Sequence, residues 1–146
     1  MRHLASITKK TMLVIILCVA FSSSCHAYEF AEKWTKADTA LQATFISLGL
    51  IDWAQTRWMA KQDWYWKDTH HIEMNPFLGR KPHQDKADFL IPVGLVLHTV
   101  VAMALPSSYK IKGFDIMPRR TWQLIFIGAE LGAVGNNFNI GARIGF

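Results

Sequence analysis

Three ionisable side chains lie inside long apolar stretches of this sequence. Asp52, His98 and Glu130 each interrupt a segment that is long and apolar enough to be a membrane span. A charge in hydrocarbon costs at least a few kcal/mol, so such a residue usually faces a protein interior and often marks a site. Side chains of these types could bind a cation or carry a proton, or they could join helices through hydrogen bonds.

The first candidate pair is Asp52 and Thr56, which lie one helical turn apart. As a site, Asp52 would hold a proton or a cation, or anchor a polar network with His98 or Glu130. As a structural group, it would hydrogen-bond to Thr56 or to a neighbouring helix, because polar contacts commonly join helices in membranes. Glu130 has two interpretations as well: a proton relay or substrate contact, or the partner of His98 or Arg57.

Residues 73–79, Glu-Met-Asn-Pro-Phe-Leu-Gly, form a compact loop motif between the first two apolar segments. Asn-Pro starts a turn and glycine ends it, so turn chemistry alone explains much of the motif. In the alternative, Glu73 and Asn75 build a polar or metal site together with His70 and His71. The histidines and Glu73 are suitable ligand types, but their spacing specifies no metal, and we therefore predict none.

The first 27 residues have the pattern of a secretory signal peptide. A basic start is followed by an apolar core and by small residues that place cleavage before Tyr28. The core of about ten residues is too short for a hydrocarbon layer that needs about twenty. Lipidation at Cys25 and retention of the segment as an anchor are the alternatives. Since Cys18 and Cys25 are the two cysteines of the chain, cleavage leaves no disulfide, cysteine nucleophile or zinc-thiolate site.

The composition indicates a membrane protein. Charged residues make up 18% of the 146 residues and hydrophobic residues 51%, whereas soluble proteins carry about 25% charged residues. The deficit comes from apolar segments near residues 38–60, 87–106 and 121–138. We therefore predict an all-α fold, in which a single domain of residues 28–146 forms a small bundle of about three transmembrane helices in the lipid bilayer.

The first of these segments carries a polar stripe. Residues at spacings of four and three share one face of a helix. The stripe consists of Asp38, Gln42, Phe45, Gly49, Asp52 and Thr56. In a membrane the stripe packs inward and the apolar remainder meets lipid. The alternative is a soluble amphipathic helix, in which the orientation is reversed.

The formal net charge of +5 does not indicate nucleic-acid binding. Cleavage removes Arg2, Lys9 and Lys10, so sixteen basic residues become thirteen against eleven acidic ones, a net charge of +2. The remaining basic residues lie mainly in loops that flank the spans, which is typical of membrane topology. Aromatic and charged residues mix over residues 57–67, which we interpret as an interfacial belt rather than a nucleotide-stacking surface.

The third apolar segment carries a small-residue contact motif, Gly128-x-x-x-Gly132. Small residues four apart let helix backbones approach closely in a bilayer. We therefore expect this face to bind a second copy of the chain or another membrane protein. Glu130 and Asn137 lie seven residues apart and share a face of the same helix.

Several motifs of the chain carry a resemblance. They are Asp52-x-x-x-Thr56, Glu73-x-Asn75-Pro76-x-x-Gly79, and a closing stretch from Trp122-Gln123 through Glu130 to Asn137 and Gly141-x-Arg143. With these motifs, residues 38–146 resemble a loosely defined group of small membrane proteins from bacteria and bacteriophage genomes. The resemblance implies a bacterial or phage inner-membrane protein, and the signal-peptide pattern predicts export through the secretory pathway. The group has no established activity, so the resemblance implies no catalytic residue and no cofactor.

The chain carries no complete catalytic signature. A nucleophile elbow, a phosphate loop, a two-histidine zinc helix and a dinucleotide fingerprint are all absent from the sequence. We therefore expect a small integral membrane protein of the bacterial envelope that acts by protein–protein interaction. If it is phage-encoded, it would modify the host envelope, as in lysis or the exclusion of other phages. The alternative is an intramembrane enzyme or transporter subunit that uses Asp52, Glu73 and Glu130.

Overall fold

Three helices account for most of the described chain. The computed structural model describes residues 33–73, 75 and 77–145, and the segment with the signal-peptide pattern lies outside them. The helices are α2 (Lys36–Lys61), α3 (Gln84–Ala104) and α4 (Pro118–Asn139). Two short antiparallel hairpins connect them, β1 (Tyr65–Trp66) with β2 (Thr69–His70), and β3 (Tyr109–Ile111) with β4 (Phe114–Ile116). The predicted helical fold is confirmed at this level, but the two strand pairs lie where the sequence analysis expected plain loops.

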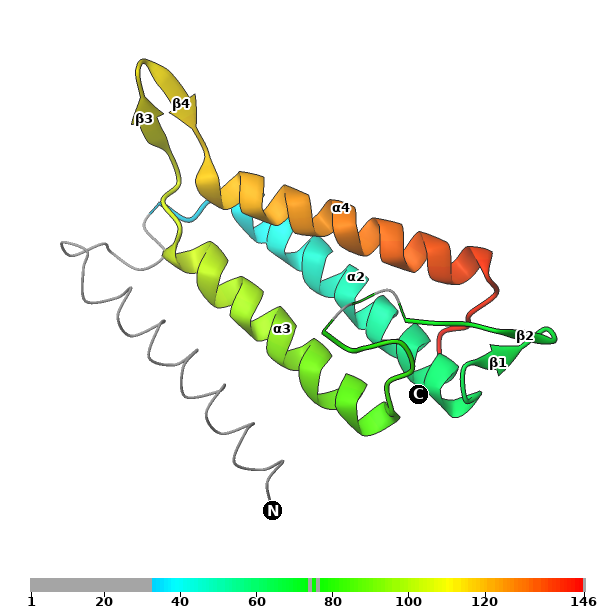
Figure 1. Ribbon diagram of the computed structural model, residues 1–146. Helices are drawn as coiled ribbons and strands as arrows, with labels where there is room; N and C mark the ends of the chain where they lie inside the picture. Colours follow the sequence, from blue (N-terminus) through cyan, green and yellow to red (C-terminus); the bar gives the residue numbers. More distant parts are fainter. Residues whose placement is uncertain (1–32, 74, 76, 146) are drawn as a thin grey trace. The chain divides into compact units, whose positions relative to one another are not determined.

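Helix α2 lies between α3 and α4 and packs against both (Figure 1). It begins at a capping box, in which the Thr35 hydroxyl accepts a hydrogen bond from the amide of Asp38, and the Asp38 carboxylate accepts one from the amide of Thr35. Such a box satisfies two of the amide groups that a helix start leaves unpaired. All six residues of the polar stripe are buried, so the face that the sequence predicted to pack inward does so.

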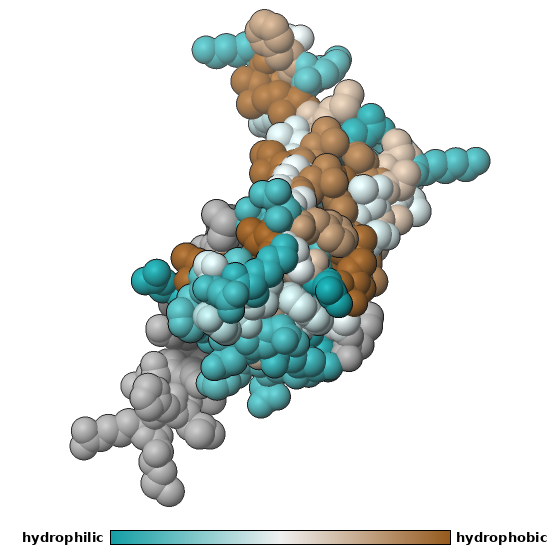
Figure 2. Space-filling model, turned by 90° about the vertical axis from the view of Figure 1, so that its right-hand side faces the viewer, coloured by the Kyte–Doolittle hydropathy of each residue, from teal (hydrophilic) through white to brown (hydrophobic). Residues whose placement is uncertain are grey.

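The interior contains polar side chains beside apolar ones, and many large apolar side chains are exposed on the outer surface. The buried polar side chains are Asp38, Gln42, Asp52, Gln55, Thr56, His98, Arg119, Gln123 and Asn137. Large apolar side chains of α3 and α4 point outward, among them Phe89, Val96, Leu97, Val100, Leu124, Ile125, Leu131 and Phe138. In Figure 2, apolar side chains cover much of the upper part of the face shown, and hydrophilic ones gather in its lower part. Buried polar side chains and exposed large apolar ones are the informative departures from the usual distribution.

Of the described helices, α3 alone is long and apolar enough to cross a membrane, judged by length and composition. The predicted spans near 38–60 and 121–138 are helical, as α2 and α4, but they do not meet this criterion. The reason is the polar side of each helix, which lowers the average hydropathy of any window along it. For α2 that side includes Asp38, Gln42 and Asp52, all of them buried.

A small apolar core lies at the end of the domain that carries β1 and β2. It contains the buried side chains of Met59, Trp64, Trp66 and Ala142. The indole of Trp64 donates to the Pro82 carbonyl at 3.2 Å, and the indole of Trp66 donates to the Ile140 carbonyl at 3.0 Å. Two of the tryptophans that the sequence analysis assigned to an interfacial belt are therefore core residues, and they fasten the loops to the helices.

The opposite end of the domain is fastened by Arg119, whose side chain is only 1% exposed. Its guanidinium donates hydrogen bonds to the carbonyls of Ala102 and Leu105, at distances of 2.8 to 3.1 Å. It also forms an ion pair with Asp38 at 3.6 Å. These carbonyls lie at the end of α3, where a helix leaves its last four carbonyls without helical partners. Arg119 thus connects α4, the end of α3 and the first turn of α2.

Candidate functional site

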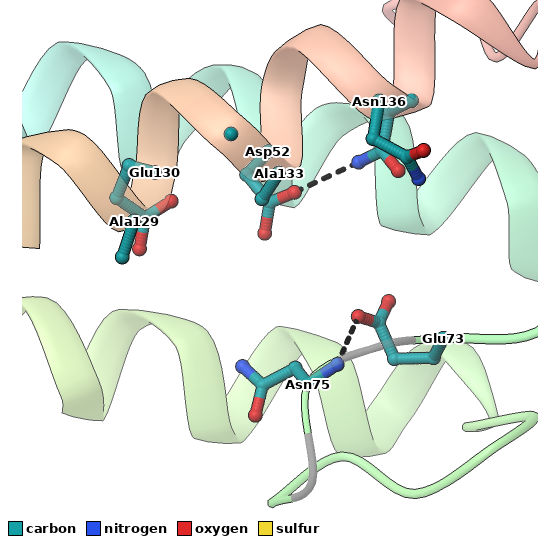
Figure 3. Close-up of a pocket in the computed structure, with 9 residues that line it drawn as sticks. Asp52, Glu73, Asn75, Ala129, Glu130, Ala133 and Asn136 are labelled. Carbon is teal, nitrogen blue, oxygen red and sulfur yellow. Dashed lines mark hydrogen bonds between the residues drawn. The ribbon is translucent and has the colours of Figure 1, made fainter.

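A polar cleft of about 400 Å³ lies between α2, α4 and the loop after β2. We call it the carboxylate cleft. Its lining consists of Asp52, Glu73, Asn75, Ala129, Glu130, Gly132, Ala133, Asn136 and Asn137. Figure 3 shows most of these side chains, with α4 and α2 on one side and the loop that carries Glu73 and Asn75 on the other. Three carboxyl groups from three separate elements therefore share one space.

Asp52 enters the cleft from the polar stripe of α2. It is 8% exposed, and the side-chain amide of Asn137 donates a hydrogen bond to it at 2.9 Å. Asn137 lies seven residues after Glu130 on α4, so both side chains project from the same face two turns apart. The sequence left two hydrogen-bond partners open for Asp52, Thr56 or a neighbouring helix. The observed donor, Asn137, belongs to the neighbouring helix α4.

Glu73 and Asn75 are held by the turn chemistry that the sequence predicted. The Glu73 carboxylate accepts hydrogen bonds from the Asn75 amide at 2.8 Å and from the Thr56 hydroxyl at 3.4 Å. The Asn75 side-chain oxygen accepts from the Phe77 amide at 3.0 Å, and Gly79 closes the turn with a φ of +82°. A left-handed φ of this kind favours glycine. The turn and the polar site are therefore not alternatives, since the turn is what points Glu73 at the helices.

Glu130 completes the set from α4. One of its carboxylate oxygens, Oε2, is buried without a hydrogen-bond partner among the described residues. A buried polar atom without a partner costs about 1–3 kcal/mol. Among the described residues, Glu130 does not form the predicted contacts with His98 or Arg57. It lines the cleft instead, and Arg57 pairs with Asp88 at 3.5 Å.

His98 lies in a separate polar cluster nearer the Asp38 end of α2. Its Nδ1 is 3.3 Å from the amide nitrogen of Gln42, and its ring stacks on Phe45 with centroids 3.7 Å apart. The rings of Trp122 and Phe126 lie 5.5 and 5.0 Å away. Gln42 precedes Asp52 by ten residues, or about 15 Å of helix. The predicted network between His98 and the carboxylates is therefore absent from the described contacts, and His98 does not belong to the cleft.

The structure thus brings together five of the six candidate residues, either in the lining or, for Thr56, as a donor to it. Three side-chain amides, two buried and one exposed, were not predicted as site residues from the sequence. Gln55 is fully buried, Gln123 donates to the Asp38 carbonyl and to the Gln42 side chain, and Asn136 lines the cleft. A signal for Gln123 was present in the sequence, because Gln123, Glu130 and Asn137 recur every seven residues on α4.

The histidines before the loop do not join the cleft. His71 stacks on Trp66 with ring centroids 3.6 Å apart, and His70 lies beside Tyr65 and Lys81. In the described ranges, no group of three or more His, Cys, Asp or Glu side chains is placed to hold a metal ion. The metal set of His70, His71 and Glu73 that the sequence analysis considered is therefore not assembled.

The arrangement suits a cationic group or a proton, because the cleft combines three carboxyl groups with amide donors and acceptors. None of the nine residues that line it is a Lys, Arg or His. No family model, no curated protein and no solved structure matches the chain. The interpretation of the cleft therefore depends on its own geometry.

Proposed function

We propose that this protein is a small integral membrane protein of the bacterial envelope, in which all three helices are embedded in the inner membrane. One observation carries the proposal, namely that nine polar or charged side chains of the described residues are buried while large apolar ones face outward on α3 and α4. Outward apolar side chains cost free energy in water, at about 25 cal/mol per Å² of exposed apolar area. The same side chains cost nothing in lipid, and the inward polar groups find partners on neighbouring helices.

The polar sides of α2 and α4 are compatible with this proposal. Hydropathy averages over all faces of a helix, but lipid meets the outer face alone. On α2 the outer face carries Leu50, which is 43% exposed, while Gln42, Asp52 and Gln55 are buried. Polar residues within membrane helices almost always face the bundle interior in this way.

Membrane extraction tests the proposal. The full-length chain, expressed in a bacterial host, should sediment with membranes and stay there after washing with alkaline carbonate. A peripheral or soluble protein would be released into the supernatant by this treatment, and that result would refute the proposal. The triple variant Val96→Glu, Leu97→Glu, Val100→Glu gives a matched comparison, because these exposed side chains can change without disturbing the interior. It should insert poorly, since a charge at mid-span costs about 2.5–3.5 kcal/mol.

We propose further that the protein acts by protein–protein interaction through the exposed glycine face of α4. Gly128 and Gly132 are exposed, and no described atom lies within 4 Å of the position a Cβ would take at either. A second helix could therefore approach the backbone closely there. Phage lysis and the exclusion of other phages are processes in which a small envelope protein of this kind would act.

The size of the native complex tests this interaction. Gly128→Ile should shift the complex extracted in mild detergent to the mass of the single chain. Gly94→Ile is the matched control, because Gly94 lies on α3 and is equally open. If both variants migrate like the unmodified protein, or if the unmodified protein is already a single chain, the interaction is not made through α4.

A second function has an observation in its favour, which is the convergence of Asp52, Glu73 and Glu130 in one cleft. An intramembrane enzyme or a transporter subunit could use these carboxyl groups to move protons or to hold a cationic substrate. The variants Asp52→Asn and Glu73→Gln keep the shape of the side chains and remove the charge. If the phenotype of the producing cell is lost while the variants accumulate with unchanged helix content, the carboxylates act in chemistry. If the variants disappear from the membrane, the network is structural.

A further inference from the structure

The β3–β4 hairpin has two chemically different faces. Its register pairs Tyr109 with Ile116 and Ile111 with Phe114, whereas Lys110 pairs with Asp115. Side chains alternate between the two faces of a strand, so the first two pairs share one face and the third pair occupies the other. The hairpin is thus fully amphipathic, with four apolar residues on one face and a pair of opposite charges on the other.

The apolar face of this hairpin is largely exposed. Its members are between 39% exposed, at Ile116, and 77% exposed, at Phe114. The hairpin extends beyond the ends of α3 and α4 (Figure 1), and its apolar and hydrophilic side chains lie next to each other at the top of Figure 2. A lone two-stranded hairpin is at best marginally stable in water. The apolar face therefore needs a cover from outside the described residues.

A tight two-residue turn closes the hairpin. Lys112 and Gly113 both have positive φ, +49° and +88°, which is typical of the two-residue turns that suit the twist of paired strands. A lysine in this conformation is strained relative to glycine or asparagine. Lys112 is thereby held at the tip of the hairpin as an exposed positive charge.

We propose that the apolar face lies on the bilayer surface, in the headgroup region, and that it favours anionic lipids. The position follows from the chain, since four residues separate the hairpin from the end of α3, the helix apolar enough to span. The depth is limited, because the open strand edges could not be satisfied in hydrocarbon. The charge fits as well: Lys110, Lys112 and Lys36 are exposed at this end, and basic groups at a membrane surface attract anionic headgroups.

This inference rests on the proposed membrane location, and the experiment separates the two. Single cysteines are introduced into a full-length chain in which Cys18 and Cys25 are replaced by serine. They are placed at Phe114 on the apolar face, at Asp115 on the charged face and at Val96 on α3. Each is labelled with an environment-sensitive fluorophore and reconstituted into phosphatidylcholine vesicles with and without phosphatidylglycerol. Two quenchers are compared, aqueous iodide and lipids that carry a nitroxide near the headgroup or deep in the chain.

The expected pattern differs among the three positions. The Phe114→Cys label should be quenched several-fold more by the shallow nitroxide than the Asp115→Cys label, which should respond to iodide. The Val96→Cys label should respond to the deep nitroxide. Shallow quenching at position 114 should increase with phosphatidylglycerol, and Lys112→Gln should reduce that increase.

Each contrary result overturns a defined part of the reasoning. If position 96 is quenched by the deep nitroxide while position 114 stays open to iodide, the hairpin inference fails and the membrane location stands. If position 96 is open to iodide, the membrane location fails, and the hairpin inference fails with it. Protection of position 114 that disappears on dilution of the protein in lipid would identify a second copy as the cover and would also overturn the inference. If shallow quenching at position 114 does not change with the phosphatidylglycerol content, the preference for anionic lipid is overturned.

Discussion

Replacement of Arg119 by methionine should destabilise the domain more than any other single change of charge at that end. The substitution keeps most of the apolar stem but removes the guanidinium, which donates to the carbonyls of Ala102 and Leu105 and pairs with Asp38. Both partners of the ion pair are almost completely buried, at 1% and 2% exposure. The variant therefore strands two helix-terminal carbonyls and weakens the neutralisation of a buried carboxylate.

The expected cost follows from these contacts. Removal of one partner from a buried ion pair costs about 3–5 kcal/mol. Asp38 retains Arg120, whose Nε lies 3.2 Å away, so the loss should fall toward the lower end of that range. The matched control is Arg120→Met, because the Arg120 side chain is 37% exposed and contacts the same carboxylate. Arg120→Met removes an ion pair whose cationic partner is partly exposed, whereas Arg119→Met also removes the donors to two carbonyls, so we expect Arg119→Met to cost more.

The free energy of unfolding is measured in mild detergent by titration with a denaturing detergent, with helix content as the signal. Arg119→Lys is measured alongside, and it should recover only part of the loss, because a compact ammonium lacks the planar fork of N–H groups that contacts both carbonyls and Asp38. Amide hydrogen exchange reports whether the loss begins at the end of α3. If Arg119→Met costs no more than Arg120→Met, Arg119 does not fasten the helices as its contacts indicate.

Two further changes test the packing of the helices and of the loops. Gly49→Ile should destabilise the domain by about 1–3 kcal/mol, because a side chain at Gly49 would collide with Leu95. Gly128→Ile should change the stability of the single chain by less than about 0.5 kcal/mol. If the same unfolding titration shows a larger loss for Gly128→Ile than for Gly49→Ile, the close contact of α2 with α3 is disproved. Trp64→Phe removes the donor to the Pro82 carbonyl and should cost about 1–3 kcal/mol, whereas an unchanged thermal unfolding midpoint would mean that water replaces the indole.

The inward face of α2 was predictable from the sequence, and the register between helices was not. Residues at spacings of three and four share a helix face whatever the helix packs against, so Asp52 and Thr56 could be assigned correctly to a buried stripe. The position of His98 depends on how far α3 is shifted along α2, which no pattern within α3 specifies. His98 consequently lies beside Gln42 and Phe45, rather than beside the carboxylates.

The two hairpins were missed although one of them has a readable pattern. The segment of β3 and β4 alternates as Tyr-Lys-Ile and Phe-Asp-Ile around a Lys-Gly turn, which is the period of a strand pair. Its strands have three residues each, shorter than the four to eight residues that make alternation convincing. The Lys-Gly turn also lacks the asparagine or aspartate that usually announces such a hairpin.

Folding stability explains the polar cluster around Asp38, at the start of α2, better than it explains the carboxylate cleft around Asp52. At the first end, Asp38 pairs with Arg119 and Arg120, so the buried charges have opposite signs. At the other end, Asp52 and Glu130 share the cleft with Glu73, and its nine lining residues include no basic side chain. Like charges that share a site repel each other and disfavour the ionised state of the group. The carboxylate cleft is therefore the part of the molecule for which folding gives the weakest explanation, and functional variants should be sought there first.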